Sequence, residues 1–329
     1  MTYTLGFTGD VMLGRLVDER QRTRAVDAVW DGALSRLRAL DALFINLECP
    51  LSTRGRPWQR THRPFHFRAD QDWAVPALSA AGVDWATLAN NHLLDFGEPA
   101  LLDTLDALSA AGIAHSGAGR DERDARAPAT ATVGELTVAF CSATDNTPEY
   151  AAGPDGPGVA RTALDLNDPT ERGKLATAVD DALATDPDLL VASLHWGPNM
   201  TTEVFGRHRE VGHWLLDRGV DVVHGHSAHV FKAVEVADNG LLMYDCGDFV
   251  DDYAVDDALR NDRSFLFELT VAEDGTPEQL RLVPVEIRNC AVHLAGGAVA
   301  QWCRETMRRR SREFDTAFER DGEALVAAW

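Results

Sequence analysis

An alternation of short apolar segments with longer segments of helical periodicity constrains the fold of this chain most. Segments rich in β-branched and apolar residues predict strands, and the apolar spacing between them predicts helices. The predicted strands are Thr4–Thr8, Ala42–Asn46, Trp85–Ala89, Val138–Ser142, Leu189–Leu194 and Val220–His224. The predicted helices cover residues 23–39, 71–81, 98–111, 167–184 and 206–218. This alternation predicts an α/β fold.

The pattern changes after residue 228, where strand-like segments follow one another without helices. Turn residues such as Asp238-Asn239-Gly240 separate them, so we expect a meander added to the same core. The Pro- and Gly-rich stretch 143–166 is long for a connection and predicts a lid or an excursion over a site. The charged segment 297–328 is interpreted as a helix. We therefore predict one domain over residues 1–290 and a helical extension, 291–329, packed on it.

Side chains that are suited to binding metal ions follow nearly every predicted strand. They are Asp10, Glu48, Asn90, Asn91, His92, His195, His224, His226 and His229. In open α/β sheets, ligands bind beyond the carboxyl ends of the strands. Each residue has an ordinary alternative role, as a turn or helix cap, a local hydrogen bonder or a structural histidine. A single metal centre accounts for all of them together.

The types of ligand also restrict the metal. Carboxylate, amide and imidazole groups without thiolates favour Mn, Fe or Zn, as one or two ions, and argue against a cysteine-rich structural zinc site. The five cysteines form no C-x-x-C pair, which predicts reduced thiols rather than a disulfide framework. Cys49 directly follows Glu48 and is interpreted as a core thiol.

The charge of the chain bears on its partners and location. With 31 Lys and Arg against 52 Asp and Glu, its formal charge is −21, which argues against nucleic acid as a partner. No apolar run approaches the roughly 20 residues of a membrane span, and the first residues lack the features of a signal peptide. We therefore expect no membrane anchor and a cytoplasmic location. The acidic excess suggests the hypothesis of a salt-rich cytoplasm, testable by melting temperature against KCl concentration.

The strand-end residues lie in motifs that resemble, in order, those of the CapA (poly-γ-glutamate capsule synthesis) family. The motifs are Thr8-Gly9-Asp10-Val11-Met12-Leu13-Gly14, Asn46-Leu47-Glu48-Cys49-Pro50-Leu51, Ala89-Asn90-Asn91-His92 with Asp95 and Gly97, Leu194-His195-Trp196-Gly197, Gly225-His226-Ser227-Ala228-His229-Val230 and Tyr244-Asp245-Cys246-Gly247-Asp248-Phe249. That family is similar in fold to the calcineurin-like metallophosphoesterases. The resemblance, over about residues 3–288, implies a four-layer α-β-β-α sandwich carrying one or two metal ions.

The resemblance also implies roles for single residues. Asp10 would bind the first metal, Glu48 would take the place of the bridging carboxylate, and Asn91 and His195 would serve the second metal. The metal ligands would be completed by His226 and His229. His92 matches the histidine that, in phosphoesterases, protonates the leaving oxygen, so the resemblance makes it the general acid.

Three positions depart from the phosphoesterase pattern. Met12 stands where D-x-H places a histidine, Ala228 stands where G-H-x-H places one, and Glu48 lies within N-L-E. These departures imply a weakened metal site, with a single metal or a different chemistry as the alternatives.

Outside the predicted metal ligands, Asp248 begins the acidic stretch GDFVDDY. The commoner interpretation of that stretch is a solvated acidic turn, and the functional one is that Asp248 orients a ligand histidine. Arg15, Asn90 and Arg63 are predicted to bind substrate, and the guanidinium groups of the two arginines suit carboxylates and phosphates. Arg60 is a further candidate, and for Arg60 and Arg63 the alternative interpretation is an ordinary surface arginine.

Two functional hypotheses follow from these residues and the resemblance. The first is a metal-dependent hydrolase in capsule polymer synthesis that acts on a phosphoester or a γ-glutamyl or other amide bond. The second is a binding or assembly protein for an anionic polymer that keeps the fold without turnover. Either hypothesis predicts an anionic small molecule or a γ-glutamyl polymer as the partner.

Overall fold

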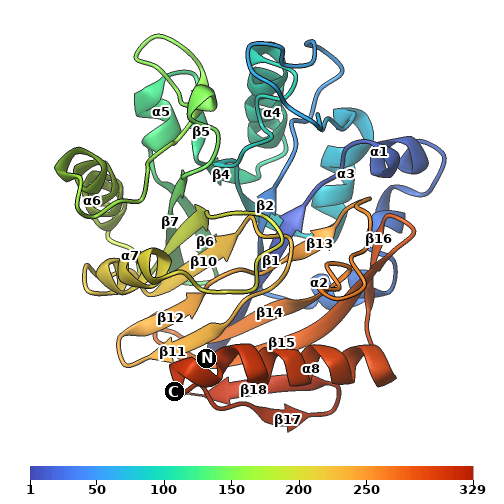
Figure 1. Cartoon of the computed structure of the whole chain (residues 1–329), viewed down its shortest axis with the longest axis vertical. Coiled ribbons are helices and arrows are strands. Elements are labelled where there is room, and N and C mark those ends of the chain that lie inside the picture. The colour runs from blue at the N-terminus through green and yellow to red at the C-terminus, as the bar shows by residue number, and fades with distance from the viewer. Residues whose placement is uncertain (329) are drawn as a thin grey trace.

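The computed structural model describes residues 1–328 and contains two large β-sheets (Figure 1). The larger sheet runs, in order, through β17 (Glu319–Asp321), β18 (Ala324–Ala328), β15 (Pro277–Arg288), β14 (Arg263–Ala272), β1 (Thr2–Val11), β2 (Ala42–Leu47), β3 (Val83–Thr87) and β4 (Ala114–Ser116). Two further strands join it, β13 (Asp248–Val250) beside β1 and β16 (Ala291–Leu294) beside β15. The smaller sheet runs through β11 (Val234–Ala237), β12 (Gly240–Met243), β10 (Val222–His226), β9 (Leu189–His195), β7 (Leu136–Thr144) and β6 (Ala129–Val133).

Helices cover the outer faces of both sheets, with α6 and α7 on one side of the molecule and α1 and α3 on the opposite side (Figure 1). The helices are α1 (Leu16–Gln21), α2 (Leu34–Leu37), α3 (Gln71–Ala81), α4 (Glu98–Ala110), α5 (Glu122–Arg126), α6 (Pro169–Leu183), α7 (Gly206–Leu216) and α8 (Gly297–Ser311). The predicted start and stop of α3 are confirmed: the Asp70 side chain accepts a hydrogen bond from the Asp72 amide, and Gly82 follows with a φ of 79°.

The four-layer arrangement follows from the alternation of side chains along the central strands. In β2, Phe44 faces the apolar layer between the two sheets, whereas Leu43 and Ile45 face the layer beneath the helices. In β9, Val191 likewise faces the layer between the sheets, and Leu190 faces α6 and α7. Because these strands are buried on both faces, their sequences are almost continuously apolar. The predicted α-β-β-α sandwich is confirmed.

Two predicted helices are wrong. Residues 23–39 form 3-10 turns at Val26–Val29 and Asp31–Ala33 and the single turn α2, because Asp31 has a positive φ of 34° and Gly32 follows it. Residues 297–328 are helical only as far as Ser311, apart from a 3-10 turn directly after it, and then form the hairpin of β17 and β18. The Asp321-Gly322 pair at the turn of this hairpin is a typical hairpin signal, and the many charged residues before it favoured the helix interpretation.

The residues after 290 are therefore not a purely helical extension. β16 and β18 both pair with β15, so this part of the chain adds strands to the larger sheet. The division into 1–290 and 291–329 stays a prediction.

The 143–166 segment leaves β7 and packs on the loop that follows β3. It contains a 3-10 turn at Pro148–Tyr150 and the two-residue strand β8 (Gly158–Val159), which pairs with β5 (Ala118–Gly119). The Tyr150 hydroxyl donates a hydrogen bond to Asp95 at 2.9 Å. The segment is thus an excursion held against that loop, and its action as a lid stays a prediction.

All five cysteines are buried and free, as predicted, and Cys49 lies in the apolar layer beneath the helices. Within residues 1–328, none of the helices has both the length and the apolar character that crossing a bilayer requires.

Candidate metal centre

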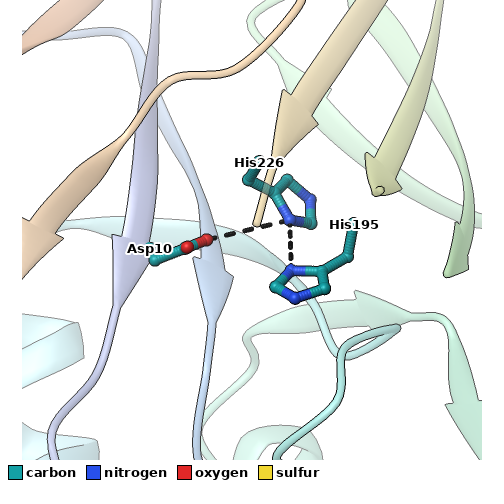
Figure 2. Close-up of side chains that lie close together, drawn as sticks. All are labelled: Asp10, His195 and His226. Atoms are coloured by element: carbon teal, nitrogen blue, oxygen red, sulfur yellow. Dashed lines mark hydrogen bonds and ion pairs between the residues drawn. The ribbon is translucent and has the colours of Figure 1, made fainter. Parts of the chain in front are cut away.

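Asp10, His195 and His226 come together from the two sheets at the carboxyl ends of their strands. Asp10 lies near the end of β1, while His195 and His226 end β9 and β10 and are paired with each other in the sheet register. The Nδ1 atoms of the two histidines are 2.8 Å apart, and His226 Nδ1 is 3.8 Å from Asp10 Oδ1 (Figure 2). All three side chains are fully buried.

A chain of hydrogen bonds between the sheets fixes the tautomer of His226. His224 Nε2 is 2.7 Å from the Thr8 carbonyl, which only accepts, so Nε2 carries the proton and His224 Nδ1 accepts. The Ser193 hydroxyl lies 3.1 Å from His224 Nδ1 and 3.1 Å from His226 Nε2. It therefore donates to His224 and accepts from His226. This assignment, made from the network, leaves an unprotonated Nδ1 on His226 that faces Asp10.

A second group shares Asp10 and adds Glu48, His229 and Asp248. One ligand-type atom from each of the four lies within 4.8 Å of the others. His229 Nδ1 is 3.2 Å from Asp10 Oδ2 and 2.9 Å from Asp248 Oδ1. Asp10 is therefore the member common to both groups, whereas the resemblance had implied Glu48 as the bridging carboxylate.

The backbone of the GHSAH motif explains how His229 reaches this group. Ser227 has a φ of 113° and His229 a φ of 60°, both in the sparsely populated left-handed half of conformational space. Such strain is kept where the surrounding structure holds it, commonly at functional sites. Ala228 stands at the position where a ligand histidine was expected. The turn instead brings the imidazole of His229, one residue later, to Asp10.

Several buried polar atoms in this region have no hydrogen-bond partner among residues 1–328. They are Asp10 Oδ2, Glu48 Oε1, Asn91 Oδ1, His195 Nε2 and Asp248 Oδ2. Leaving a buried polar group unpaired costs about 1–3 kcal/mol, and more for a charged one. Five such atoms at the ends of neighbouring strands indicate that the site is built for a group that is not part of the chain.

The electrostatics of the site call for a cation. Burial and the neighbouring Asp10 charge raise the pKa of Glu48 well above its usual value. Burial also raises the pKa of Asp248. Burial lowers the pKa of His195 to about 3 and that of His226 well below its usual range, so both imidazoles are neutral. Burial disfavours the charged form of His229, but the charges of Asp248 and Glu48 outweigh it and raise its pKa.

The residues present therefore fit a divalent metal. Neutral imidazoles and carboxylates supply nitrogen and oxygen ligands, and the shared Asp10 links two ligand groups. Cys49 is not suited to contribute, because burial keeps its thiol protonated by raising its pKa and its side chain lies in the apolar layer.

His92 lies beside this centre in the loop after β3. Its Nδ1 is 2.6 Å from Asp95 Oδ2, and its ring stacks on Phe67 with 3.9 Å between centroids. Asp95 also accepts hydrogen bonds from the Phe67 amide and the Tyr150 hydroxyl, so its carboxylate is held in place. Because Nδ1 is engaged with Asp95, Nε2 is the nitrogen left for proton transfer. Burial lowers the pKa of His92 below its usual value.

Asn90 and Asn91 have different environments in the same loop. The Asn90 amide nitrogen donates to the Leu47 carbonyl at 2.8 Å and to Asn46 at 3.1 Å, and its oxygen accepts from the His92 amide. Asn90 thus shapes the loop, and its predicted contact with substrate stays untested. Asn91 Oδ1, by contrast, is buried and unpaired, as a metal ligand would require.

The two arginines predicted to bind substrate flank the loop of His92. Arg63 donates from Nη1 to Thr147 Oγ1 at 2.7 Å and from Nη2 to the Asn91 carbonyl. Arg15 is only partly exposed, pairs with Asp252 at 3.2 Å and stacks against Phe65. Both guanidinium groups therefore have partners within the chain, and their substrate contacts stay predictions.

The acidic stretch after residue 247 is not a solvated turn. Asp248 and Asp251 are buried, and Asp248 contacts His229 in the way that the functional interpretation predicted. The turn interpretation is wrong because β13 pairs with β1 directly beside Asp10. Pairing of Asp10 with Asp248 places the carboxylate within the cluster.

Sequence reasoning gave no role to two residues of the site. Asn46 donates a hydrogen bond to Asp10 Oδ1 at 2.6 Å, and the Tyr253 hydroxyl lies 3.3 Å from Glu48 Oε2. Asn46 could have been found, because it lies one residue before the end of β2 and two residues before Glu48. Tyr253 carries no such signal, since it follows a loop whose course depends on the pairing of β13.

The fold and the site define a four-layer α-β-β-α protein with a buried, carboxylate-rich metal-type centre at the carboxyl ends of its strands. The sequence matches the family described as bacterial capsule synthesis protein PGA_cap over residues 4–253. The chain belongs to this family, which confirms the resemblance noted in the sequence.

Named relatives extend over most of the chain. A probable polyglutamine synthesis accessory protein of Mycobacterium tuberculosis is 33% identical over 95% of this chain and 92% of its own length. The capsule biosynthesis protein CapA of Bacillus anthracis is 28% identical over 87% of this chain and 67% of its own length. The PGA biosynthesis protein CapA of Bacillus subtilis is 25% identical over 85% of this chain and 70% of its own length.

Among solved structures, a purple acid phosphatase from yellow lupin seeds matches 87% of this chain with a TM-score of 0.36 and 10% identity. The chain spans about half of that phosphatase, 52%.

Proposed function

We propose that this protein is a metal-dependent hydrolase that acts on a phosphoester or a γ-glutamyl or other amide bond during the synthesis of a glutamate-type capsule polymer. The observation that carries the proposal is the pair of ligand groups sharing Asp10, with unpaired buried atoms on Glu48, His195 and Asp248. The names of the relatives supply the polymer context. The substrate would be an anionic small molecule or the γ-glutamyl polymer itself.

The metal would be held by Asp10 together with His195 and His226 on one side and Glu48, His229 and Asp248 on the other. Mn, Fe or Zn would suit these ligands, and Asn91 is the remaining candidate. When bound, the ion would polarise the scissile bond and activate water. His229 would have to release its proton to serve as a ligand, since metal ligation requires a neutral imidazole.

His92 would act as the general acid of the reaction. Asp95 holds Nδ1 and the stacked Phe67 ring limits rotation, so Nε2 is presented in a fixed orientation. His92 would act as the imidazolium, with one proton on Nδ1 held by Asp95 and a second on Nε2; transfer of the Nε2 proton to the leaving oxygen or nitrogen would leave the neutral imidazole that burial favours. Arg15 and Arg63 are the candidate groups for anion binding beside it.

The test combines metal analysis with kinetics. Protein purified without chelator is analysed for metal, then assayed with Mn²⁺ on a phosphodiester and on γ-glutamyl peptides. His92→Ala should lower turnover by about 10²- to 10⁴-fold without loss of bound metal. His213→Ala is the matched control, because His213 is a partly exposed histidine on α7 that lies 3.1 Å from Glu235. Equal turnover of the two variants would contradict the role of His92.

One observation favours the second candidate function, a binding or assembly protein without turnover. Met12 is buried where phosphoesterases carry a ligand histidine, and its sulfur accepts a hydrogen bond from the Gly14 amide. The centre therefore lacks one imidazole. Metal bound at the centre together with no hydrolysis of either substrate class, in wild type and His92→Ala alike, would support this candidate.

A further inference from the structure

A cationic segment crosses the surface next to the candidate centre in this otherwise acidic protein. Residues 54–68, here called the arginine strap, contain no Asp or Glu within a chain of net charge −21. The strap carries five arginines, Arg54, Arg56, Arg60, Arg63 and Arg68. It has almost no regular secondary structure and runs past the start of α4 (Figure 1). We propose that the arginine strap is a docking surface for a linear polymer of carboxylates and that it leads the polymer toward His92.

Three of the five arginines are engaged with the protein. Arg54 forms an ion pair with Asp103. Arg63 bonds Thr147 and the Asn91 carbonyl. Arg68 donates to the Arg54 carbonyl and lies over the Phe96 ring. These contacts hold the strap in one course across the surface, so its remaining charges are presented from a fixed backbone.

Arg56 and Arg60 are exposed, and neither has an ion-pair partner among the described residues. They line a cavity of about 550 Å³ between the strap and residues 96–99. The Arg60 guanidinium lies over the Trp58 ring, 4.9 Å from its centroid, so an aromatic face supports the cation. Glu98 is the one acidic residue in the lining, so positive charge dominates there.

The same cavity wall connects directly to the candidate general acid. The Trp58 amide donates to the Asp95 carbonyl at 2.8 Å, and its ring packs against Tyr150 with 4.8 Å between centroids. Tyr150 and His92 both bond the Asp95 carboxylate. Further along the strap, Phe67 stacks on His92. A chain held at Arg56 and Arg60 would therefore lie beside the loop that carries His92.

The chemistry of the strap fits a polymer better than a single small anion. A γ-linked glutamate polymer carries one carboxylate on every residue, so separate arginines can each engage one. Once one carboxylate is bound, the next is delivered at high effective concentration. This inference rests on the proposed function for its substrate class, but the docking itself requires no turnover.

The test is a binding measurement on the intact, metal-loaded protein with labelled poly-γ-glutamate, read by fluorescence anisotropy at low salt. R56E/R60E should weaken binding by about tenfold or more, because two attractions become repulsions. R56Q/R60Q should give a smaller loss. E98Q should tighten binding by about two- to threefold, since it removes the opposing charge from the cavity.

The matched control is R123E/R312E, which changes the net charge by the same amount. Both arginines are exposed and make no side-chain ion pair within the described part of the chain. This control should keep the wild-type affinity within about twofold. Equal weakening by both double variants would overturn the proposal, since net charge alone would then explain binding. Tighter binding of anionic vesicles or single-stranded DNA than of the polymer would also overturn it.

The outcome can be separated from that of the hydrolase proposal. Turnover is measured on a short γ-glutamyl peptide, whereas docking is measured by anisotropy without hydrolysis. Docking without turnover would retain the strap and reject the hydrolase. Turnover of the peptide without polymer docking would reject the strap alone.

Discussion

Glu48→Gln should change stability in opposite directions with and without metal. Glu48 is fully buried, its Oε1 has no partner among residues 1–328, and Asp10 and Asp248 lie close to it. In chelator, replacing this carboxyl group with a neutral amide removes the burial cost and the repulsion from Asp10 that raise its pKa. The amide is itself only partly satisfied, so this relief amounts to about 1–2 kcal/mol, and the variant should be the more stable protein under those conditions.

In the presence of metal, the wild type should be more stable than Glu48→Gln. Free metal at one hundred times the dissociation constant adds about 2.7 kcal/mol to the wild type, which corresponds to about 4 °C in melting temperature for a chain of this size. An uncharged amide oxygen is a weaker ligand, so we expect affinity to fall by roughly 100-fold. The same metal concentration then adds only about 0.4 kcal/mol to the variant.

The assay is thermal unfolding of both proteins in chelator and in excess Mn²⁺. Glu268→Gln is the matched control, because Glu268 is a buried carboxylate with a cation partner, Arg36, at 2.5 Å. It should lose about 1–2 kcal/mol in both conditions, allowing for the partial exposure of Arg36. If Glu48→Gln instead lost the same stability with and without metal, as this control should, Glu48 would not be a metal ligand.

Three further predictions concern other parts of the molecule. Ser193→Ala removes the hydroxyl that fixes the His226 tautomer and should weaken metal binding by about 10- to 100-fold in calorimetric titration; unchanged affinity would refute the proposed relay. Gly9→Ala should destabilise the protein by about 3 kcal/mol or more in denaturant titration, since the added Cβ would lie 1.8 Å from the Gly247 carbonyl oxygen. Gly173 lies within α6 with open space around it, so Gly173→Ala should stabilise the protein by about 0.5–1 kcal/mol. A change of the same sign in both variants would contradict these expectations. Bonds from Lys174, Ala163 and Thr162 outweigh burial and lower the pKa of Glu171 from 4.5 to about 2, so its carboxylate stabilises the fold above pH 4.5 and loses this effect as the pH falls toward 2. Glu171→Gln should therefore cost about 1 kcal/mol at pH 7 and nothing near pH 2, and a constant difference across that range would exclude the carboxylate as the cause.

Much of the site could be predicted from the sequence because parallel strands deliver their ends to one edge. Asp10, His195 and His226 each end or nearly end a strand, and the sheet geometry alone brings them together. The same regularity made the central strands and the helices α3 and α4 predictable. Their apolar periodicity and glycine stops agree with the tertiary structure.

The rest depends on contacts that a single sequence does not encode locally. The place of Asp248 in the cluster follows from the pairing of β13 with β1, across more than two hundred residues of chain. The reach of His229 depends on positive φ angles at Ser227 and His229, which are uncommon for residues other than glycine. The C-terminal hairpin was hidden because its apolar strand, β18, is short and follows a long charged helix.

Anomalous scattering from crystals of protein grown with Mn²⁺ would show directly whether Asp10 and its neighbours bind metal. We expect one or two peaks adjacent to Asp10, between the His195 and His226 pair and the Glu48 and Asp248 carboxylates, at about 2.0–2.3 Å from ligand atoms. A crystal soaked in metal that shows no peak at Asp10, or shows its metal elsewhere on the protein, would contradict this expectation.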